Sequence, residues 1–191
     1  METGAIYRPA GREDSRQIAE LYRMAAGGVA DYVWSGLAEE GESVLDVGER
    51  RFRRRDEEFS FQNCIVATRE RKIIGMVHAF PMIERTEIAE DFDPVLRPYA
   101  ELEHVPSLYI AGIAVYPEFR GQRIGEGLMM GVAMYHRDAD IEDYSLIAFE
   151  ENQGSVRLYE RLGYEIVERR LIVPHEFIQY TGDALLMVHA R

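Results

Sequence analysis

The sequence has a single cysteine, Cys64, among its 191 residues, and it has no long apolar run. One cysteine excludes a disulfide within the chain. No stretch approaches the roughly 18–20 apolar residues that a membrane span needs. The segment Met1–Ser15 lacks the apolar core of a signal peptide. These absences predict a cytoplasmic protein that does not use a membrane as a partner. Cys64 lies in a short apolar run, which is typical of a small core residue rather than of a nucleophile.

Positive charge is also scarce, since 22 Lys and Arg face 34 Asp and Glu, which gives a net charge of −12. A surface this acidic disfavours nucleic acid, whose affinity depends on basic contacts to phosphate. It favours cationic partners through electrostatic steering, or it serves solubility alone. We expect no metal site. The length suits one domain over residues 1–191.

Apolar spacing predicts an α/β (α+β) protein with one mixed, mostly antiparallel sheet and helices on both faces. We expect strands at Ala5–Arg8, Cys64–Thr68, Lys72–Phe80 (ended by Pro81), Leu108–Tyr116, Tyr144–Phe149, Tyr164–Val173 and Ala184–His189. We expect helices at Arg12–Ala26, within Gly27–Arg55, at Gly121–Tyr135 and at Ser155–Leu162. Gly112, inside a strand, indicates a bulge or a close backbone approach.

The turn between Val115 and Leu128 ends an apolar strand and begins a helix. The first N–H groups of a helix have no partner inside the helix, and the helix dipole favours an anion there. A pyrophosphate could therefore bind at this turn, where Gly121 and Gly125 leave room and Arg120 adds a charged donor. The spacing fits neither a Walker loop nor a Rossmann turn.

This turn resembles the acyl-CoA signature of the GNAT superfamily, whose core is Gln/Arg-x-x-Gly-x-Gly/Ala. The matching residues are Val115-x-Pro117-x-x-Arg120-Gly121-x-x-Ile124-Gly125-x-x-Leu128. Arg123 replaces the middle glycine. A backbone N–H contact survives that replacement unless the position requires a positive φ.

A second segment resembles the later Asn…Ala/Ser…Tyr…Gly-Phe pattern of the same superfamily. It reads Asn152-x-x-Ser155-x-x-x-Tyr159-x-x-x-Gly163-Tyr164. Ser155 and Tyr159 are four residues apart and share one helix face. The two motifs together indicate the superfamily but no particular substrate.

The resemblance implies a GNAT-like fold and direct transfer of an acetyl group from acetyl-CoA to a primary amine in a ternary complex. The pantetheine arm is expected between splayed strands at 108–115 and 144–149, where it would pair with Ile113 and Val115. An N–H near Ile113 would polarise the thioester carbonyl. The implied CoA-binding set is Ile113, Ala114, Val115, Arg120, Gly121, Gln122, Arg123, Ile124, Gly125, Glu126, Asn152, Ser155 and Tyr159.

The implied catalytic set is Tyr159, Glu103 and Tyr109. By the family pattern Tyr159 would protonate the departing thiolate. An alkyl amine of pKa about 10.4 is only roughly 0.04% neutral at pH 7, so a base would help. Tyr109 occupies the position where some members carry Glu or His, although tyrosine is a poor base. Glu103 or His104 could act through water, and His78 is a further candidate.

The acceptor stays open between small-molecule and peptide amines. We expect the connection Ile83–Ser107 to be irregular. Its part from Glu84 to Ser107 suggests a cationic acceptor, because it carries seven acidic residues against two arginines. The acidic residues are Glu84, Glu87, Glu90, Asp91, Asp93, Glu101 and Glu103, and the arginines are Arg85 and Arg97. A homodimer is one option for assembly. The alternative function is a catalytically inactive acyl-CoA-binding sensor or partner-binding module of the same fold.

Overall fold

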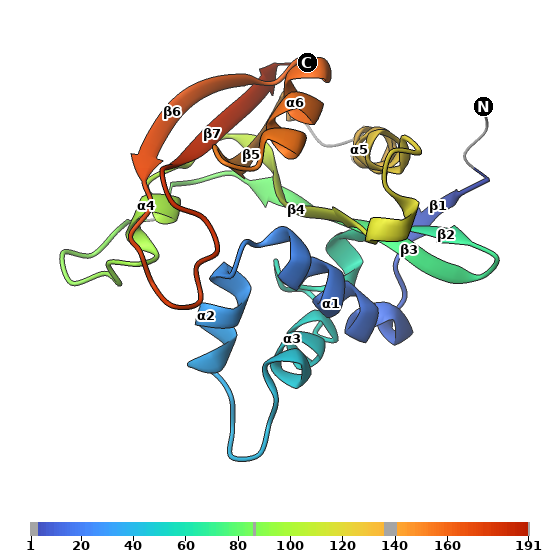
Figure 1. Cartoon of the computed structure of the whole chain (residues 1–191), viewed down its shortest axis with the longest axis horizontal. Helices are drawn as coiled ribbons and strands as arrows, with labels where there is room; N and C mark the ends of the chain where they lie inside the picture. Colours follow the sequence, from blue (N-terminus) through green and yellow to red (C-terminus); the bar gives the residue numbers. More distant parts are fainter. Residues whose placement is uncertain (1–3, 86, 136–140, 191) are drawn as a thin grey trace. The chain divides into compact units, whose positions relative to one another are not determined.

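The computed structural model describes residues 4–85, 87–135 and 141–190. The chain forms two compact units. Figure 1 labels the helices and strands of both. The first takes its described residues from 1–79 and 112–139, and the second from 80–111 and 140–191. Each unit is described by itself, and one domain over residues 1–191 stays a prediction.

Seven strands are hydrogen-bonded in the order β1-β2-β3-β4-β5-β7-β6. The described neighbours pair antiparallel, except for β4 and β5, which are parallel. The expected α/β fold with a mixed, mostly antiparallel sheet is thus confirmed. The strands are β1 (Ile6–Pro9), β2 (Cys64–Arg69), β3 (Lys72–Met82), β4 (Ser107–Val115), β5 (Asp143–Phe149), β6 (Glu165–Leu171) and β7 (Asp183–Ala190). The α-helices are α1 (Ser15–Ala25), α2 (Val29–Ser35), α3 (Val44–Phe52), α4 (Arg97–Ala100), α5 (Ile124–Tyr135) and α6 (Gln153–Arg161).

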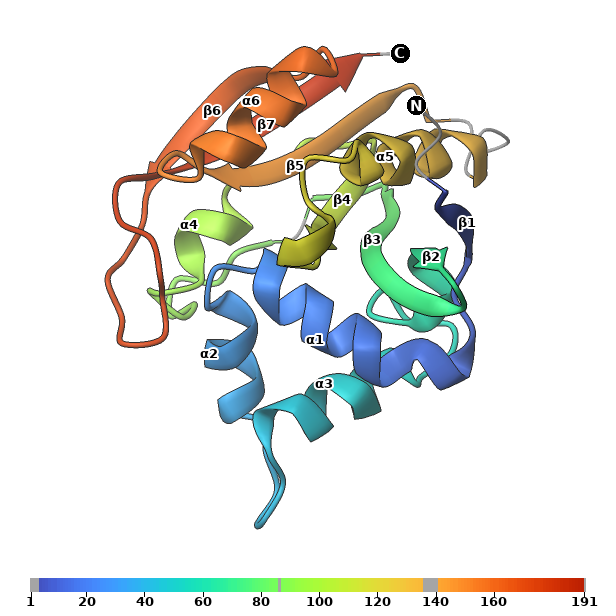
Figure 2. The same cartoon turned by 45° about the vertical axis from the view of Figure 1, so that its right-hand side comes forward.

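In the first unit, α1 and α3 cover one face of the β1–β3 strands and α5 covers the other (Figures 1 and 2). The strand period of two explains this division. Val66 of β2 belongs to the core that α1, α2 and α3 build around Trp34 and Phe52. Its neighbour Ile65 points the opposite way, toward Gly131 of α5. Cys64 is buried, as predicted.

In the second unit, β5 pairs with β7 along its whole length, and β7 pairs with the edge strand β6. Helix α6 packs against β5, and the short helix α4 packs against β6 (Figure 2). The parallel ladder of β4 with β5 joins Leu108–Ile110 to Tyr144–Leu146. The buried hydroxyl groups of Ser107, at the start of β4, and Ser145 of β5 are 2.7 Å apart. None of the described helices combines the length and apolar character that crossing a membrane requires.

Three local predictions were wrong. The strand expected to end at Pro81 continues to Met82, because β2 pairs with β3 only as far as His78 and no bond to β2 is lost at Pro81. The helix expected from Gly121 begins at Ile124. The connection expected to be irregular contains the one-turn helix α4.

Candidate cofactor and acyl-transfer site

The turn before α5 is built from a 3₁₀ helix, Pro117–Phe119, and two residues in the left-handed region. These are Gly121, with φ of +73°, and Arg123, with φ of +59°. The N–H of Gly127 donates to the C=O of Arg123 at 3.1 Å. The N–H groups of Ile124 and Gly125 precede that bond and so have no acceptor within the helix. The structure therefore has backbone N–H groups without a helical acceptor at the start of a twelve-residue helix, the position at which helices bind anions.

Arg123 stands in the conformation that favours glycine. The sequence left open the φ of this position, and the structure shows that Arg123 itself adopts a positive value. A left-handed residue other than glycine costs about 1–2 kcal/mol. The side chain is exposed, so the strain affects the backbone of the turn and not the core.

Side chains from two elements fix the shape of the turn. The Nε of Arg120 donates to the C=O of Val115 at 3.0 Å and so folds back onto the end of β4. Gln122 accepts a hydrogen bond from Arg69 at 2.9 Å through its Oε1. The guanidinium group of Arg69 also lies over the ring of Phe119, 5.4 Å from its centroid. Sequence reasoning missed Arg69 and Phe119, because only the fold brings the end of β2 to this turn.

The end of β4 presents alternate backbone groups to opposite sides. The N–H of Tyr116 donates to Ile74 of β3, and the C=O of Ala114 faces Gly75 of the same strand. The backbone groups of Ile113 and Val115 therefore point away from β3, as pairing with a pantetheine arm would require. Ala114 is placed differently, because its carbonyl faces β3 and its side chain is buried in the core.

Gly112 lies under helix α1. A Cβ built on it would be 3.1 Å from the ring of Tyr22 and 3.3 Å from the Cβ of Ala25. The sequence allowed either a bulge or a close backbone approach at Gly112, and the structure shows the close approach.

The second motif lies on α6 in the second unit. Asn152 caps the helix, since its Oδ1 accepts from the N–H of Ser155 at 3.3 Å. A hydrogen bond joins the hydroxyl groups of Ser155 and Tyr159. Tyr159 is buried, with 7% of its surface exposed, and its ring centroid is 6.0 Å from that of Tyr164. Asn152 thus positions the helix, while Ser155 contacts the hydroxyl that the motif singles out.

Burial raises the pKa of Tyr159 above its ordinary value, the hydrogen bond to Ser155 lowers it, and Tyr109 raises it further. Burial, with a contribution from the charge of Glu103, raises the pKa of Tyr109 to about 12. Both tyrosines therefore hold their protons at neutral pH. They can donate a hydrogen bond or a proton, and neither can act as a base there.

The two histidine candidates occupy different environments. The Nε2 of His104 lies 2.6 Å from a carboxylate oxygen of Asp143, next to the start of β4. His78 is fully buried in the first unit among aromatic rings, and its Nε2 is 2.8 Å from the C=O of Glu58. Burial lowers the pKa of His78 to about 4. His78 is thus a core residue in this structure.

A protein-family model identifies the family of this chain. The model described as "Acetyltransferase (GNAT) family" matches residues 30–164, more than half of the chain. The chain belongs to the GNAT acetyltransferase family. No curated protein matches it significantly.

Solved structures share the GNAT fold with this chain at low identity. An N-acetyltransferase from Staphylococcus aureus Mu50 has 18% identity and a TM-score of 0.63, over 96% of this chain and 100% of that one. A Drosophila melanogaster polyamine N-acetyltransferase that forms N-acetylagmatine has 18% identity and a TM-score of 0.66, over 98% and 100%. A PaiA N-acetyltransferase from Thermoplasma acidophilum in complex with coenzyme A has 13% identity and a TM-score of 0.58, over 98% and 99%. At these identities the likeness shows the fold.

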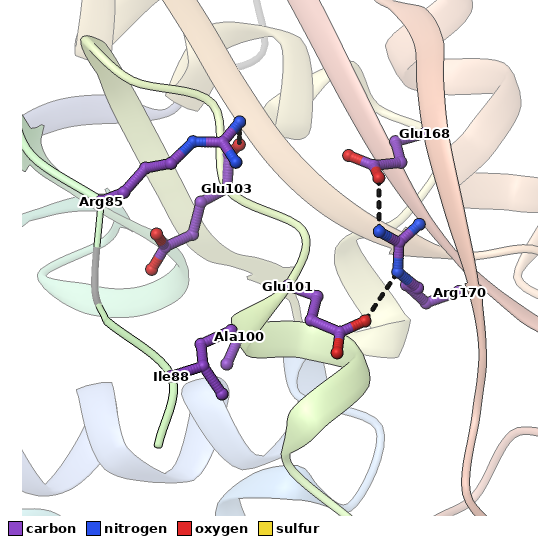
Figure 3. A pocket seen from close by; sticks show the side chains of 7 residues that line it. All are labelled: Arg85, Ile88, Ala100, Glu101, Glu103, Glu168 and Arg170. Atoms are coloured by element: carbon purple, nitrogen blue, oxygen red, sulfur yellow. Dashed lines mark hydrogen bonds and ion pairs between the residues drawn. The ribbon is translucent and has the colours of Figure 1, made fainter. Parts of the chain in front are cut away.

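The second unit of this GNAT chain also holds a pocket of about 200 Å³ (Figure 3). Glu103 is one of its lining residues, and Glu101, Glu168, Arg85 and Arg170 are the other charged ones. Sequence reasoning found the acidic residues of the connection but missed Glu168 and Arg170, because their alternation along β6 resembles an ordinary solvated strand. Within the described residues, no group of three or more His, Cys, Asp or Glu is arranged to hold a metal ion.

Proposed function

We propose that this GNAT protein transfers an acetyl group from acetyl-CoA to a primary amine by direct attack within a ternary complex. The observation that carries the proposal is the turn before α5. There the N–H groups of Ile124 and Gly125 precede the first bond of the helix, beside an arginine held in the left-handed region. Such a turn is suited to a pyrophosphate.

The turn also leaves room for the cofactor. Within the described residues no heavy atom lies within 4 Å of a Cβ built on Gly121, and Arg120 is anchored through its Nε. The backbone from Gln122 to Glu126 would hold the pyrophosphate, and Ile113 and Val115 would pair with the pantetheine arm. Acetyl-CoA, when bound, supplies an activated thioester. The CoA complex of the Thermoplasma PaiA protein, which has this fold, supports the choice of cofactor.

Tyr159 is the proposed general acid. Its hydroxyl is buried, protonated and oriented by Ser155, so it can donate a proton to a departing thiolate. Tyr109 is a second donor whose charge environment includes Glu103. Glu103 or His104 is the proposed base, and it would take the amine proton through water.

The acceptor is a primary amine of a small molecule or peptide, and we propose that it is cationic. The acidic connection between β3 and β4 supports this, as does the polyamine N-acetyltransferase of the same fold. We further propose a cytoplasmic location, because the chain has a single cysteine.

Thiol release from acetyl-CoA tests the function. The purified protein is mixed with acetyl-CoA and a panel of amines, and free CoA and the acetylated product are both measured. Amine-dependent release with matching product formation supports the proposal. CoA binding by calorimetry without release for any amine would support the binding module instead. Absence of CoA binding at millimolar concentration would contradict both the acetyltransferase and the acyl-CoA-binding module.

A further inference from the structure

The pocket in Figure 3 combines an apolar part with a charged rim. Ile88 and Ala100 supply the apolar part. Three carboxylates and two guanidinium groups supply the rim, namely those of Glu101, Glu103, Glu168, Arg85 and Arg170. Its volume of about 200 Å³ is below the roughly 300–1,000 Å³ of pockets for drug-sized ligands. It therefore suits a short alkyl chain with one polar end.

Arg170 is held between two of the carboxylates. Its Nε lies 2.8 Å from Oε2 of Glu101, and its Nη2 lies 2.5 Å from Oε1 of Glu168. These pairs join the connection after α4 to strand β6. They also leave Arg170 poorly suited to binding an anion, because both of its sides already face carboxylates (Figure 3).

The backbone of strand β6 is irregular next to the pocket. The register of β6 against β7 shifts between Ile166 and Glu168. Such bulges redirect the side chains that follow them and are frequent beside functional sites. Glu168 and Arg170 follow the shift, and both line the pocket.

The rim keeps one net negative charge, because three carboxylates face two arginines. Arg85 is directed to the backbone, and its Nη2 donates to the C=O of Glu103 at 3.4 Å. Glu103 also contributes to the raised pKa of Tyr109. The pocket and the proposed general acid Tyr159 belong to the same unit.

We propose that this pocket binds the second, non-reacting cationic group of a short diamine acceptor, with Glu103 as the carboxylate that recognises it. This inference rests on the proposed function. The methylene chain packs on Ile88 and Ala100, and the distal ammonium group meets the carboxylate rim. A monoamine of equal length lacks that contact, and an acceptor with a distal carboxylate is repelled.

The test compares three primary amines with the same four-carbon chain. They are 1,4-diaminobutane, 1-aminobutane and 4-aminobutanoate, measured at saturating acetyl-CoA. A charge-assisted hydrogen bond typically contributes enough for a tenfold or larger preference. We therefore expect kcat/KM for the diamine to exceed that for 1-aminobutane about tenfold, after a factor of two for its two equivalent amines. We expect the 4-aminobutanoate to be the poorest acceptor.

The variant Glu103→Gln separates binding of the distal cation from catalysis by a base. Loss of the distal contact lowers kcat/KM for the diamine more than for 1-aminobutane, so the ratio falls toward two even where the value for 1-aminobutane also falls. Loss of a base alone lowers both values equally and keeps the ratio. Glu160→Gln, an exposed substitution on α6 with the same charge change, is the control and should keep the ratio of the unaltered protein.

Direct binding keeps the inference testable without turnover. Calorimetry with 1,4-diaminobutane should show binding to the unaltered protein and to Glu160→Gln, and at least tenfold weaker binding to Glu103→Gln. Equal binding by all three proteins overturns the inference, as does an unchanged diamine preference in Glu103→Gln or preference for 4-aminobutanoate. Acetylation of monoamines and diamines with equal efficiency overturns this inference alone. Absence of CoA binding, with diamine binding retained, overturns only the proposed function.

Discussion

The N–H of Gly127 donates to the C=O of Arg123 at 3.1 Å, and Arg123 itself has φ of +59°. The residue that accepts this hydrogen bond at the start of α5 is therefore a strained arginine where the family signature has glycine. The left-handed conformation costs about 1–2 kcal/mol for a residue with a Cβ, and glycine loses about 0.5–1 kcal/mol in entropy. Arg123→Gly should therefore raise the free energy of unfolding by about 1 kcal/mol in urea denaturation.

Gly121 provides the matched control for that prediction. It has φ of +73°, and a Cβ there meets open space in the described part of the chain. Gly121→Ala should lower the free energy of unfolding by about 1 kcal/mol through the backbone alone. Equal stability of Arg123→Gly and the unaltered protein would show that the turn does not hold residue 123 in the left-handed region.

The CoA site can be blocked by one charge. Gly125→Asp places a carboxylate in the first turn of α5, where the proposed pyrophosphate binds. The helix dipole stabilises the new carboxylate at the N-terminal end of α5, whereas the same carboxylate repels the phosphate. Calorimetry should show loss of CoA binding with unchanged thermal unfolding. Met130→Asp, on the exposed face of the same helix, should bind CoA normally. Normal CoA binding by Gly125→Asp would place the pyrophosphate elsewhere.

Tyr159→Phe should separate chemistry from cofactor binding. Loss of a general acid typically lowers the rate by about 10²–10⁴, so kcat should fall while the Kd for CoA stays nearly unchanged. Burial raises the pKa of Tyr159 above its ordinary value of 10. The protonated hydroxyl, which is the general acid, is therefore lost only as pH rises well above 10. The variant should therefore lack this alkaline decline in its pH–rate profile. Intact turnover with slightly lower stability would make Tyr159 a core residue only.

The sequence predicted the sheet, the main helices and both motif segments, because strand alternation, helical spacing and glycine positions are local properties. The start of α5 was wrong by three residues. A left-handed glycine and a left-handed arginine precede it, and no spacing rule identifies a strained arginine. Pro81 was treated as a strand end, since the length of the neighbouring strand β2 was not visible in the sequence.

The candidate site was only partly accessible from the sequence. Tyr159 and Ser155 share a helix face, which their spacing predicts. The contact of Arg69 with Gln122 joins residues 53 positions apart, and that of Arg170 with Glu101 joins residues 69 positions apart. Contacts at such separations depend on strand order, which a single sequence does not provide.

His78 should make stability depend on pH. The unfolded chain binds a proton on this residue near its ordinary pKa of 6.5, and the folded protein does so only near 4. The unfolded state therefore holds more protons between these values, and the free energy of unfolding falls as pH drops from about 6.5 to 4. The loss is at most about 3 kcal/mol. Urea denaturation of His78→Phe should show a weaker decline over this range than the unaltered protein, whereas His175→Phe should match it. Parallel curves for all three proteins would mean that His78 is not buried in its neutral form.

The acidic connection between β3 and β4 should make acceptor capture sensitive to salt. Glu87 and Glu90 are exposed there, and they would steer a cationic amine over distances that salt screens within about 10 Å at 0.1 M. With 1,4-diaminobutane and saturating acetyl-CoA, kcat/KM should fall by about threefold or more as ionic strength rises from 0.02 to 0.2 M. The double variant Glu87→Gln, Glu90→Gln should weaken that dependence. The control Glu160→Gln, Glu176→Gln removes the same charge from exposed positions outside the connection and should keep it. A rate independent of salt, or equal weakening by both double variants, would mean that the connection is an ordinary solvated surface and that the net charge alone attracts the amine.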